Sequence, residues 1–210
     1  MNIINLEYQN IKYNLHIVDN NNYNEYEDLL EDMNICNPEY LDKTYEAVSY
    51  SILDDKNEKI VGFFLTDKND INIYASMIID LNCTQHSELI IKNKFDVTKS
   101  IELILLCSNK RIRVKGLTTF FMKYVIDNII QNIKPNIENI FLYVSKGILN
   151  NSYAYNYYIS NGFKQISPVE PEFLNYSYSN SSGGKKNKRK TNKRTNKRTN
   201  KRKTKSRLRK

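Results

Sequence analysis

The most regular hydrophobic pattern of the chain lies at residues 101–130. Within it, residues 103–107 form a continuous apolar run that is too short for an independent helix and is bounded by polar residues, which favours a strand buried on both faces. From Leu117 onward, apolar residues recur at spacings of three and four, as on one face of a helix. The sequence therefore predicts a buried strand, a loop at 108–115, and a helix that ends within 131–135.

Shorter segments predict a sheet around this strand. Alternating polarity, or a composition rich in β-branched and aromatic residues, predicts strands at 11–18, 46–53, 59–66, 71–80, 88–92, 137–145, 164–166 and 173–178. The polar loop 54–58 is expected to join its two neighbours as a hairpin, and 168–171 to join the last two strands as another. Helical spacing predicts a helix at 23–33.

The loop between the central strand and its helix has the features of an anion site. It carries the basic residues Lys110, Arg111, Arg113 and Lys115, followed by Gly116 where the helix begins. The first amides of a helix have no intrahelical partners and the macrodipole is positive there, so backbone N–H groups can hold a phosphate. Gly116 permits a close approach of the phosphate to the chain. By itself, however, the loop is better explained as a basic solvated turn before an amphipathic helix.

A second pattern lies downstream, at residues 151–163. Ala154 and Tyr158 are four residues apart and share one face of a predicted helix, which Asn151 begins. Gly162 suits a left-handed residue at the helix end, and Phe163 then opens another strand. A tyrosine-rich amphipathic helix with a glycine cap would also give this pattern, but it does not account for the buried strand and basic loop upstream.

Together the two segments resemble the GNAT family of N-acetyltransferases. Residues 113–118 resemble the Q/R-x-x-G-x-G/A loop that binds the coenzyme A pyrophosphate, with Thr118 where the family usually has Gly or Ala. Residues 151–163 match the family's N-x-x-A-x-x-x-Y-x-x-x-G-F in order and spacing. Both motifs fall within 45–178. The resemblance implies an α/β (α+β) domain over residues 1–178, with a mixed, mostly antiparallel sheet, a central V-shaped splay and flanking helices.

The resemblance also implies an activity, the transfer of an acetyl group from acetyl-coenzyme A to a primary amine. Tyr158 matches the family's general acid, which protonates the departing thiolate. Glu102 lies eleven residues before Arg113, which is similar to the general-base glutamate of the histone-acetylating branch; a solvated glutamate at a strand start and an ordered water as base are the alternatives. The residues expected to bind the co-substrate are Leu106, Cys107, Ser108, Arg113, Val114, Lys115, Gly116, Leu117, Thr118 and Asn151.

Charge divides the chain into two unlike parts. Residues 185–210 hold 16 of the 32 Lys and Arg and no acid, so residues 1–184 carry 16 basic and 23 acidic residues, a net charge of −7. An acidic body favours a cationic acceptor, such as a polyamine, a lysine side chain or a protein N-terminus. Residues 179–184 are expected to be a flexible linker.

The basic segment 185–210 has little to pack and is expected to be disordered. Its cations would bind nucleic acid without sequence specificity, although a nuclear-localisation signal or a compositional tail without a role are alternative interpretations. An alternative function for the whole chain is therefore a nucleic-acid-binding protein whose GNAT-like domain is catalytically degenerate.

Composition excludes several other classes. Three cysteines at wide spacings argue against a disulfide framework and for a reducing compartment, so a cytoplasmic or nuclear location is expected. With two histidines and no CxxC or HxxxH motif, no metal site is expected. The N-terminus lacks the features of a signal peptide, and no apolar run approaches membrane length. The abundance of Asn, Ile, Lys and Tyr indicates an AT-rich genome. The basic tail resembles those of proteins from large DNA viruses, which suggests virion association.

Overall fold

The computed structural model describes residues 3–26, 60–84, 86–109, 111–144, 152–167 and 172–178. The predicted strand 46–53, Asn151, and the predicted linker and basic tail lie outside the described residues. In chain order, the elements are β1 (Ile3–Tyr8), β2 (Ile11–Val18), η1 (Tyr23–Tyr26), β3 (Ile60–Asp67), β4 (Ile73–Asp80), α3 (Ser87–Lys92), η3 (Val97–Lys99), β5 (Ser100–Ser108), α4 (Leu117–Tyr124), η4 (Val125–Ile130), α5 (Gln131–Ile133), β6 (Asn139–Val144), α6 (Ser152–Ser160), β7 (Lys164–Ser167) and β8 (Glu172–Ser177).

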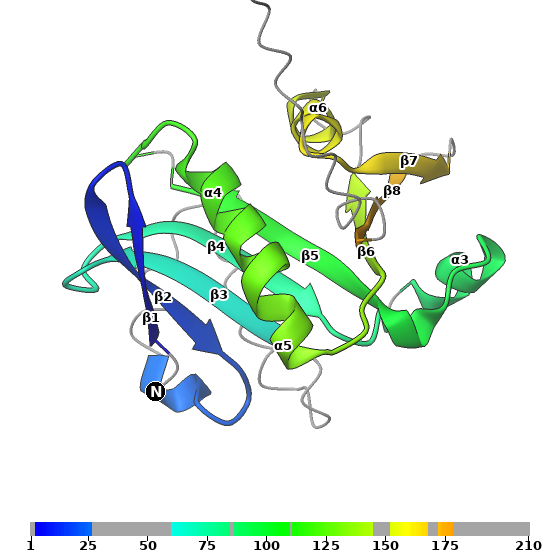
Figure 1. Cartoon of the computed structure of the whole chain (residues 1–210), viewed down its shortest axis with the longest axis horizontal. Coiled ribbons are helices and arrows are strands. Elements are labelled where there is room, and N and C mark those ends of the chain that lie inside the picture. Colours follow the sequence, from blue (N-terminus) through cyan, green and yellow to red (C-terminus); the bar gives the residue numbers. More distant parts are fainter. Residues whose placement is uncertain are drawn as a thin grey trace, which may run out of the picture.

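The described strands form one mixed sheet in the order β1-β2-β3-β4-β5-β6-β8-β7. Within it, β5 and β6 are the parallel pair, and the other described neighbours are antiparallel. The parallel ladder joins Ser100–Leu103 to Asn139–Leu142 and then stops, although β5 continues to Ser108. The two strands therefore part in a V at the middle of the sheet (Figure 1). The predicted fold class is confirmed.

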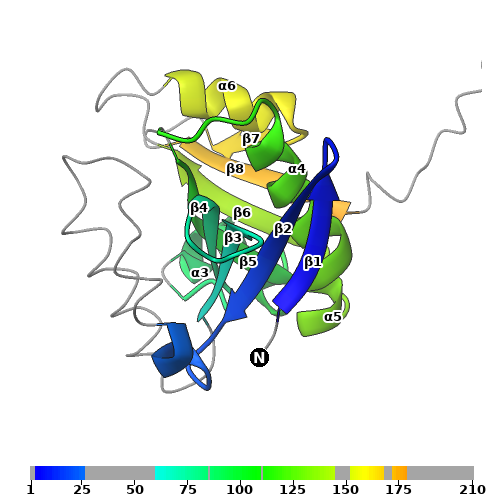
Figure 2. The same cartoon turned by 90° about the vertical axis from the view of Figure 1, so that its left-hand side faces the viewer.

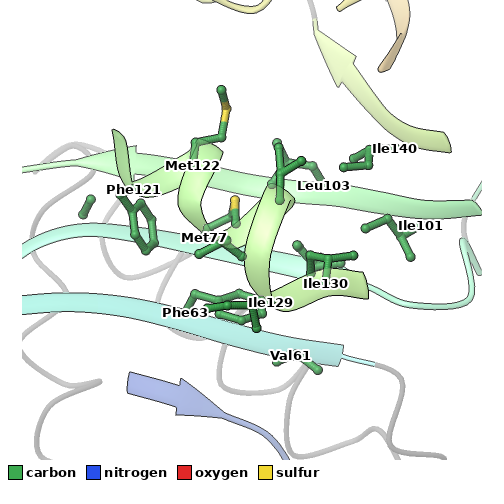
Figure 3. Close-up of a cluster of buried hydrophobic side chains, with 14 of the residues drawn as sticks. Val61, Phe63, Met77, Ile101, Leu103, Phe121, Met122, Ile129, Ile130 and Ile140 are labelled. Carbon is green, nitrogen blue, oxygen red and sulfur yellow. The ribbon is translucent and has the colours of Figure 1, made fainter. Parts of the chain in front are cut away.

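One face of the sheet is covered by α4, η4 and α5, which follow one another without a break from Leu117 to Ile133 (Figure 1). Leu117, Phe121, Val125 and Ile129 recur every fourth residue, and all are buried against the sheet. Figure 3 shows Phe121 and Met122 of this helix together with Met77 of β4 and Leu103 of β5. The predicted strand and helix are thus confirmed, and both contribute to the main core, although Ile104 within the predicted buried run is 39% exposed.

The opposite face carries a second cluster, in which Ile90 of α3 packs with Phe141 and Phe173. Phe141 belongs to this cluster whereas its neighbours Ile140 and Leu142 belong to the main core, as expected for a strand whose side chains alternate between faces. Residues 88–92 were predicted to be a strand, and this prediction is wrong: they form α3, in which the Ile90 amide donates to the His86 carbonyl at 3.0 Å. A short apolar run fits either structure.

The N-terminal half departs further from the prediction. The strand Ile3–Tyr8 was not predicted, and it pairs with β2 along its whole length. Both edges of β3 are occupied, by β2 and by β4, whereas the sequence predicted a hairpin between this strand and residues 46–53. Of the helix predicted at 23–33, the described part is the single turn Tyr23–Tyr26. In the described part of the chain, no helix is both long and apolar enough to cross a membrane.

Candidate active site

The basic loop reaches α4 through a glycine in the left-handed conformation. Gly116 has φ 80° and ψ −6° and occupies the N-cap position of the helix. The Leu117 amide donates to the Val114 carbonyl at 3.2 Å, which closes a tight turn just before the helix. Left-handed backbone is costly for residues with a Cβ, so this turn explains the glycine. The positive end of α4 consequently opens toward the loop, and Arg113 and Lys115 in the loop have exposed side chains.

The end of β1 supports this turn. The hydroxyl of Tyr8 donates to the Lys115 carbonyl at 3.0 Å, and its ring lies 4.9 Å from that of Phe120. A Cβ on residue 116 would lie 2.5 Å from the Tyr8 hydroxyl oxygen, so a side chain there would force Tyr8 to move in addition to straining the backbone. Figure 2 shows the β1–β2 hairpin beside α4. Sequence reasoning missed Tyr8 because it missed the strand that carries it.

A second support comes from Asn109, directly after β5. Its amide donates to the Tyr74 carbonyl at 2.9 Å, and its side-chain nitrogen donates to the Ile73 carbonyl at 2.8 Å. Its side-chain oxygen accepts from the amides of Arg111 and Ile112. Asn109 thus fastens the start of the loop to β4. An asparagine that follows a strand and precedes a turn is a recognisable sequence signal for such a role.

A cavity of about 760 Å³ lies over the turn. Seven of the ten residues expected to bind the co-substrate line it: Ser108, Arg113, Val114, Lys115, Gly116, Leu117 and Thr118. Six lining residues were not predicted: Tyr74, Asn109, Ile112, Thr119, Tyr153 and Tyr157. The structure therefore brings most of the predicted loop to one hollow at the end of β5.

Two other predicted residues lie deeper along β5. Leu106 is half-buried and packs against the main core, and Cys107 is buried. Cys107 is disulfide-bonded, a bond that the odd number and wide spacing of the cysteines did not predict. Because the prediction assigned Cys107 a role through its backbone amide, the disulfide does not affect that role. Among the described residues, Cys83 is the free cysteine, and it is buried.

On α6, neighbouring tyrosines lie in different surroundings. Tyr157 lines the cavity, and its hydroxyl accepts from the hydroxyl of Thr119 at 3.2 Å. Tyr158, the predicted general acid, is not among the lining residues; its ring packs edge-on against Phe163 with centroids 5.3 Å apart. Burial raises the pKa of both phenols above the ordinary value. Both hydroxyls therefore keep their protons at neutral pH.

Glu102, the predicted general base, lies apart from this cavity. It is 3% exposed and belongs to β5, where it pairs with Phe141 of β6 and so faces the α3 side of the sheet. His86 Nδ1 lies 2.5 Å from Glu102 Oε1. Burial raises the pKa of the Glu102 carboxyl, and the neighbouring His86 opposes that rise. Glu102 directly precedes Leu103, the last residue of β5 that pairs with β6, so it marks the point where the strands part.

The arrangement of sheet, splay and loop is that of the GNAT acetyltransferase fold. A PaiA N-acetyltransferase from Thermoplasma acidophilum, solved in complex with coenzyme A, has 14% identity and a TM-score of 0.50, covering 78% of this chain and 99% of that one. A GNAT-family acetyltransferase from Listeria monocytogenes has 10% identity and a TM-score of 0.54, covering 83% and 99%. Tetrahymena GCN5 has 14% identity and a TM-score of 0.52, covering 78% and 94%.

Sequence comparison adds no relative to these structures. No protein-family model matches the chain, and no curated protein matches it. At 10 to 14% identity, the similarity to solved structures establishes the fold, and the function has to be argued from the site.

Proposed function

We propose that this protein is an N-acetyltransferase that moves an acetyl group from acetyl-coenzyme A to a primary amine by direct attack of the amine on the thioester. The observation that carries the proposal is the Gly116 turn. It opens the positive end of α4 into a cavity of about 760 Å³, at the end of a strand that has parted from its parallel neighbour. A basic turn on an ordinary solvated surface requires neither the splay nor the cavity.

The residues of the cavity fit the phosphate end of this co-substrate. The amides that follow Gly116 and the charges of Arg113 and Lys115 suit a pyrophosphate. The Tyr8 hydroxyl lies 2.5 Å from the place that a Cβ of Gly116 would take, so the left-handed turn and Tyr8 account for the glycine. Thr118 lines the same cavity, so its hydroxyl is available as a hydrogen-bond donor to a phosphate oxygen.

The gap between β5 and β6 suits the thioester end of acetyl-coenzyme A. Past Leu103, β5 is hydrogen-bonded to β4 on one side, and its ladder with β6 on the other side has ended. We assign to the backbone groups of Leu106, Cys107 and Ser108 the role of holding the pantetheine arm and orienting the carbonyl. Bound acetyl-coenzyme A supplies the acetyl group in activated form.

Proton transfer to the departing sulfur is assigned to a tyrosine side chain. Tyr158 is proposed to donate the proton that the departing sulfur needs, and its raised pKa keeps that proton in place until transfer. Tyr157 is the competing donor, since it lines the cavity. For the acceptor we propose a cationic amine, attracted by the net charge of −7 on residues 1–184.

Saturating acetyl-coenzyme A is expected to raise the melting temperature of the purified chain. A ligand that binds the folded state alone adds about 2.7 kcal/mol of stability at a hundred times its Kd. Thermal melts with acetyl-coenzyme A and with its fragment adenosine 3′,5′-bisphosphate measure the effect, and a panel of a polyamine, a lysine peptide and a peptide with a free N-terminus tests transfer. If acetyl-coenzyme A produces no shift, the nucleic-acid-binding alternative takes precedence; that alternative rests on residues 185–210, outside the described part of the chain.

Replacing Tyr158 by phenylalanine is expected to lower kcat about 10²-fold while leaving the affinity for acetyl-coenzyme A unchanged, because a positioned proton donor is lost and no packing atom is. Tyr157→Phe is expected to raise KM through loss of the Thr119 hydrogen bond, with a small change in kcat. Tyr155→Phe is the matched control on the same helix, since its hydroxyl bonds Gln165. Should kcat collapse in Tyr157→Phe and not in Tyr158→Phe, the proton donor is Tyr157.

A further inference from the structure

A histidine and a glutamate form a close pair on the face of the sheet opposite α4. His86, the residue before α3, lies with Nδ1 2.5 Å from Oε1 of Glu102 on β5. Its ring also stacks on Tyr143 of β6, with centroids 4.8 Å apart and planes inclined by 19°. Three separate elements therefore fix the position and the plane of this imidazole.

The pair lies where β5 and β6 part. Glu102 is the residue before the last rung of the parallel ladder on β5, and Tyr143 is the residue after it on β6. In this region Ile104 is 39% exposed and Tyr143 is 42% exposed, although both lie on central strands. The opening between the strands is therefore accessible beside His86, on the side away from the helix that covers the main core.

Among the described residues, the hydrogen-bond contact of His86 is made by Nδ1, which leaves Nε2 for another partner. A neutral imidazole that donates from Nδ1 to a carboxylate presents a lone pair on Nε2. The His86 side chain is 25% exposed, and it lines a hollow of about 300 Å³ with Glu88, Leu89 and Lys92 of α3. An approaching amine thus has a path to Nε2.

Of the neighbouring carboxylates of Asp80 and Glu102, it is that of Glu102 that contacts the imidazole of His86. Asp80 of β4 lies across the ladder from Glu102, but its carboxylate accepts from the amides of Asn82 and Thr84. The thiol of Cys83, after β4, has a pKa raised by burial to about 12, so it stays neutral. On α3, Glu88 and Lys92 carry opposite charges. Glu102 Oε2 is buried and has no hydrogen-bond partner among the described residues, so the contact of Oε1 with His86 is the side-chain hydrogen bond that these residues provide to the carboxyl group.

We propose that His86 is the general base of the transfer reaction and that Glu102 is its positioning residue; this inference rests on the proposed function. Nε2 takes a proton from the ammonium form of the acceptor, which leaves a neutral amine and an imidazolium. The amine lone pair forms the C–N bond to the acetyl carbon as the C–S bond breaks. The sulfur keeps that electron pair and takes the proton of the Tyr158 hydroxyl, the second N–H proton restores that hydroxyl, and the imidazolium returns its proton to solvent.

The main test is His86→Asn, because the asparagine side-chain nitrogen takes the place of Nδ1 and can still donate to Glu102 while Nε2 is lost. With the amine that the wild-type protein acetylates fastest among spermine, a lysine peptide and a peptide with a free N-terminus, kcat/KM at pH 7 is expected to fall about 10²-fold. The deficit is expected to shrink toward about pH 10, where solution supplies neutral amine. Acetyl-coenzyme A affinity is expected to stay at the wild-type value, and Ile91→Ala, on the exposed side of α3, is the control expected to match wild type in all respects.

Two measurements on the unmutated protein keep the test decisive if His86→Asn does not fold. Nitrogen-15 NMR of the histidine rings, without any ligand, is expected to show the His86 proton on Nδ1; a proton on Nε2 overturns the proposal. Diethyl pyrocarbonate is expected to modify His86 and spare His16, which is 3% exposed, and to remove activity that hydroxylamine then restores.

The outcomes separate the two levels of the proposal. An active wild-type protein whose His86→Asn variant keeps wild-type kcat/KM and pH dependence overturns the role of His86 alone. A wild-type protein that binds acetyl-coenzyme A but acetylates no amine overturns the proposed function, and the role of His86 with it. If Glu102→Gln loses more activity than His86→Asn, Glu102 itself is the base and the proposal is also overturned.

Discussion

Gly116→Val is expected to abolish the binding of coenzyme A. The residue has φ 80°, a conformation that a β-branched side chain strongly disfavours, and its Cβ would lie 2.5 Å from the Tyr8 hydroxyl oxygen. Relief of either conflict moves the turn that aims the first amides of α4 at the cavity. Titration calorimetry with coenzyme A measures the effect, with circular dichroism to confirm that the variant is folded. A folded Gly116→Val protein with the wild-type Kd would contradict the assignment of this loop to the pyrophosphate.

A double variant separates the two conflicts at this position. Tyr8→Phe removes the oxygen that a Cβ would meet, so Gly116→Ala combined with Tyr8→Phe keeps the conformational cost of about 1–2 kcal/mol and loses the clash. Tyr8→Phe also removes the hydrogen bond to Lys115, so it is the reference protein. Gly116→Ala is expected to weaken coenzyme A binding less in the Tyr8→Phe protein than in the wild-type protein. Equal losses in the two proteins would show that the Tyr8 hydroxyl does not oppose a side chain at position 116.

Phe121→Ala is expected to lower the free energy of unfolding by about 3–5 kcal/mol, because it removes a fully buried ring between α4 and the sheet. That is a large share of the stability of an ordinary domain. Urea denaturation followed by circular dichroism measures it. Phe120→Ala is the matched control: the neighbouring ring is half-buried against Tyr8, and a loss of about 1–2 kcal/mol is expected. Equal losses would contradict the burial of the helix described above.

The centre of the fold could be predicted because local pattern and tertiary surroundings agree there. The apolar run in β5 is too short for an independent helix, so it predicts a strand. The four-residue spacing of Leu117, Phe121 and Val125 predicts a helix, because it places the three side chains on one helical face. For residues 88–92 the local pattern does not decide, because three apolar residues between a glutamate and a lysine suit either a strand or a helix. The packing of Ile90 against Phe141 decides in favour of the helix, and sequence alone does not contain that contact.

The site could be predicted to the level of its loop but not of its individual side chains. The loop motif identified six of the lining residues, because backbone conformation and charge are local properties, and the end of the predicted central strand supplied a seventh, Ser108. The tyrosine facing the cavity was not settled in the same way. Tyr157 and Tyr158 point about 100° apart around a helix, so the rotation of α6 decides between them, and that rotation depends on partners such as Thr119 and Phe163. The His86–Glu102 contact joins residues 16 apart in sequence that no motif connects.

The hydrogen bond from Tyr8 to Lys115 joins positions 107 residues apart in the chain. Contacts of such separation form late in folding, since a long stretch of backbone must be ordered before they are made. The turn at Gly116 is therefore expected to gain its support from β1 only after the intervening strands have paired. A chain whose first strand has not docked is expected to lack a fully supported coenzyme A loop. Coenzyme A affinity is consequently expected to depend on the docking of the N-terminal hairpin as well as on the residues of the loop. A fusion partner that prevents residues 3–8 from pairing with β2 is expected to weaken binding, although it changes no residue that lines the cavity.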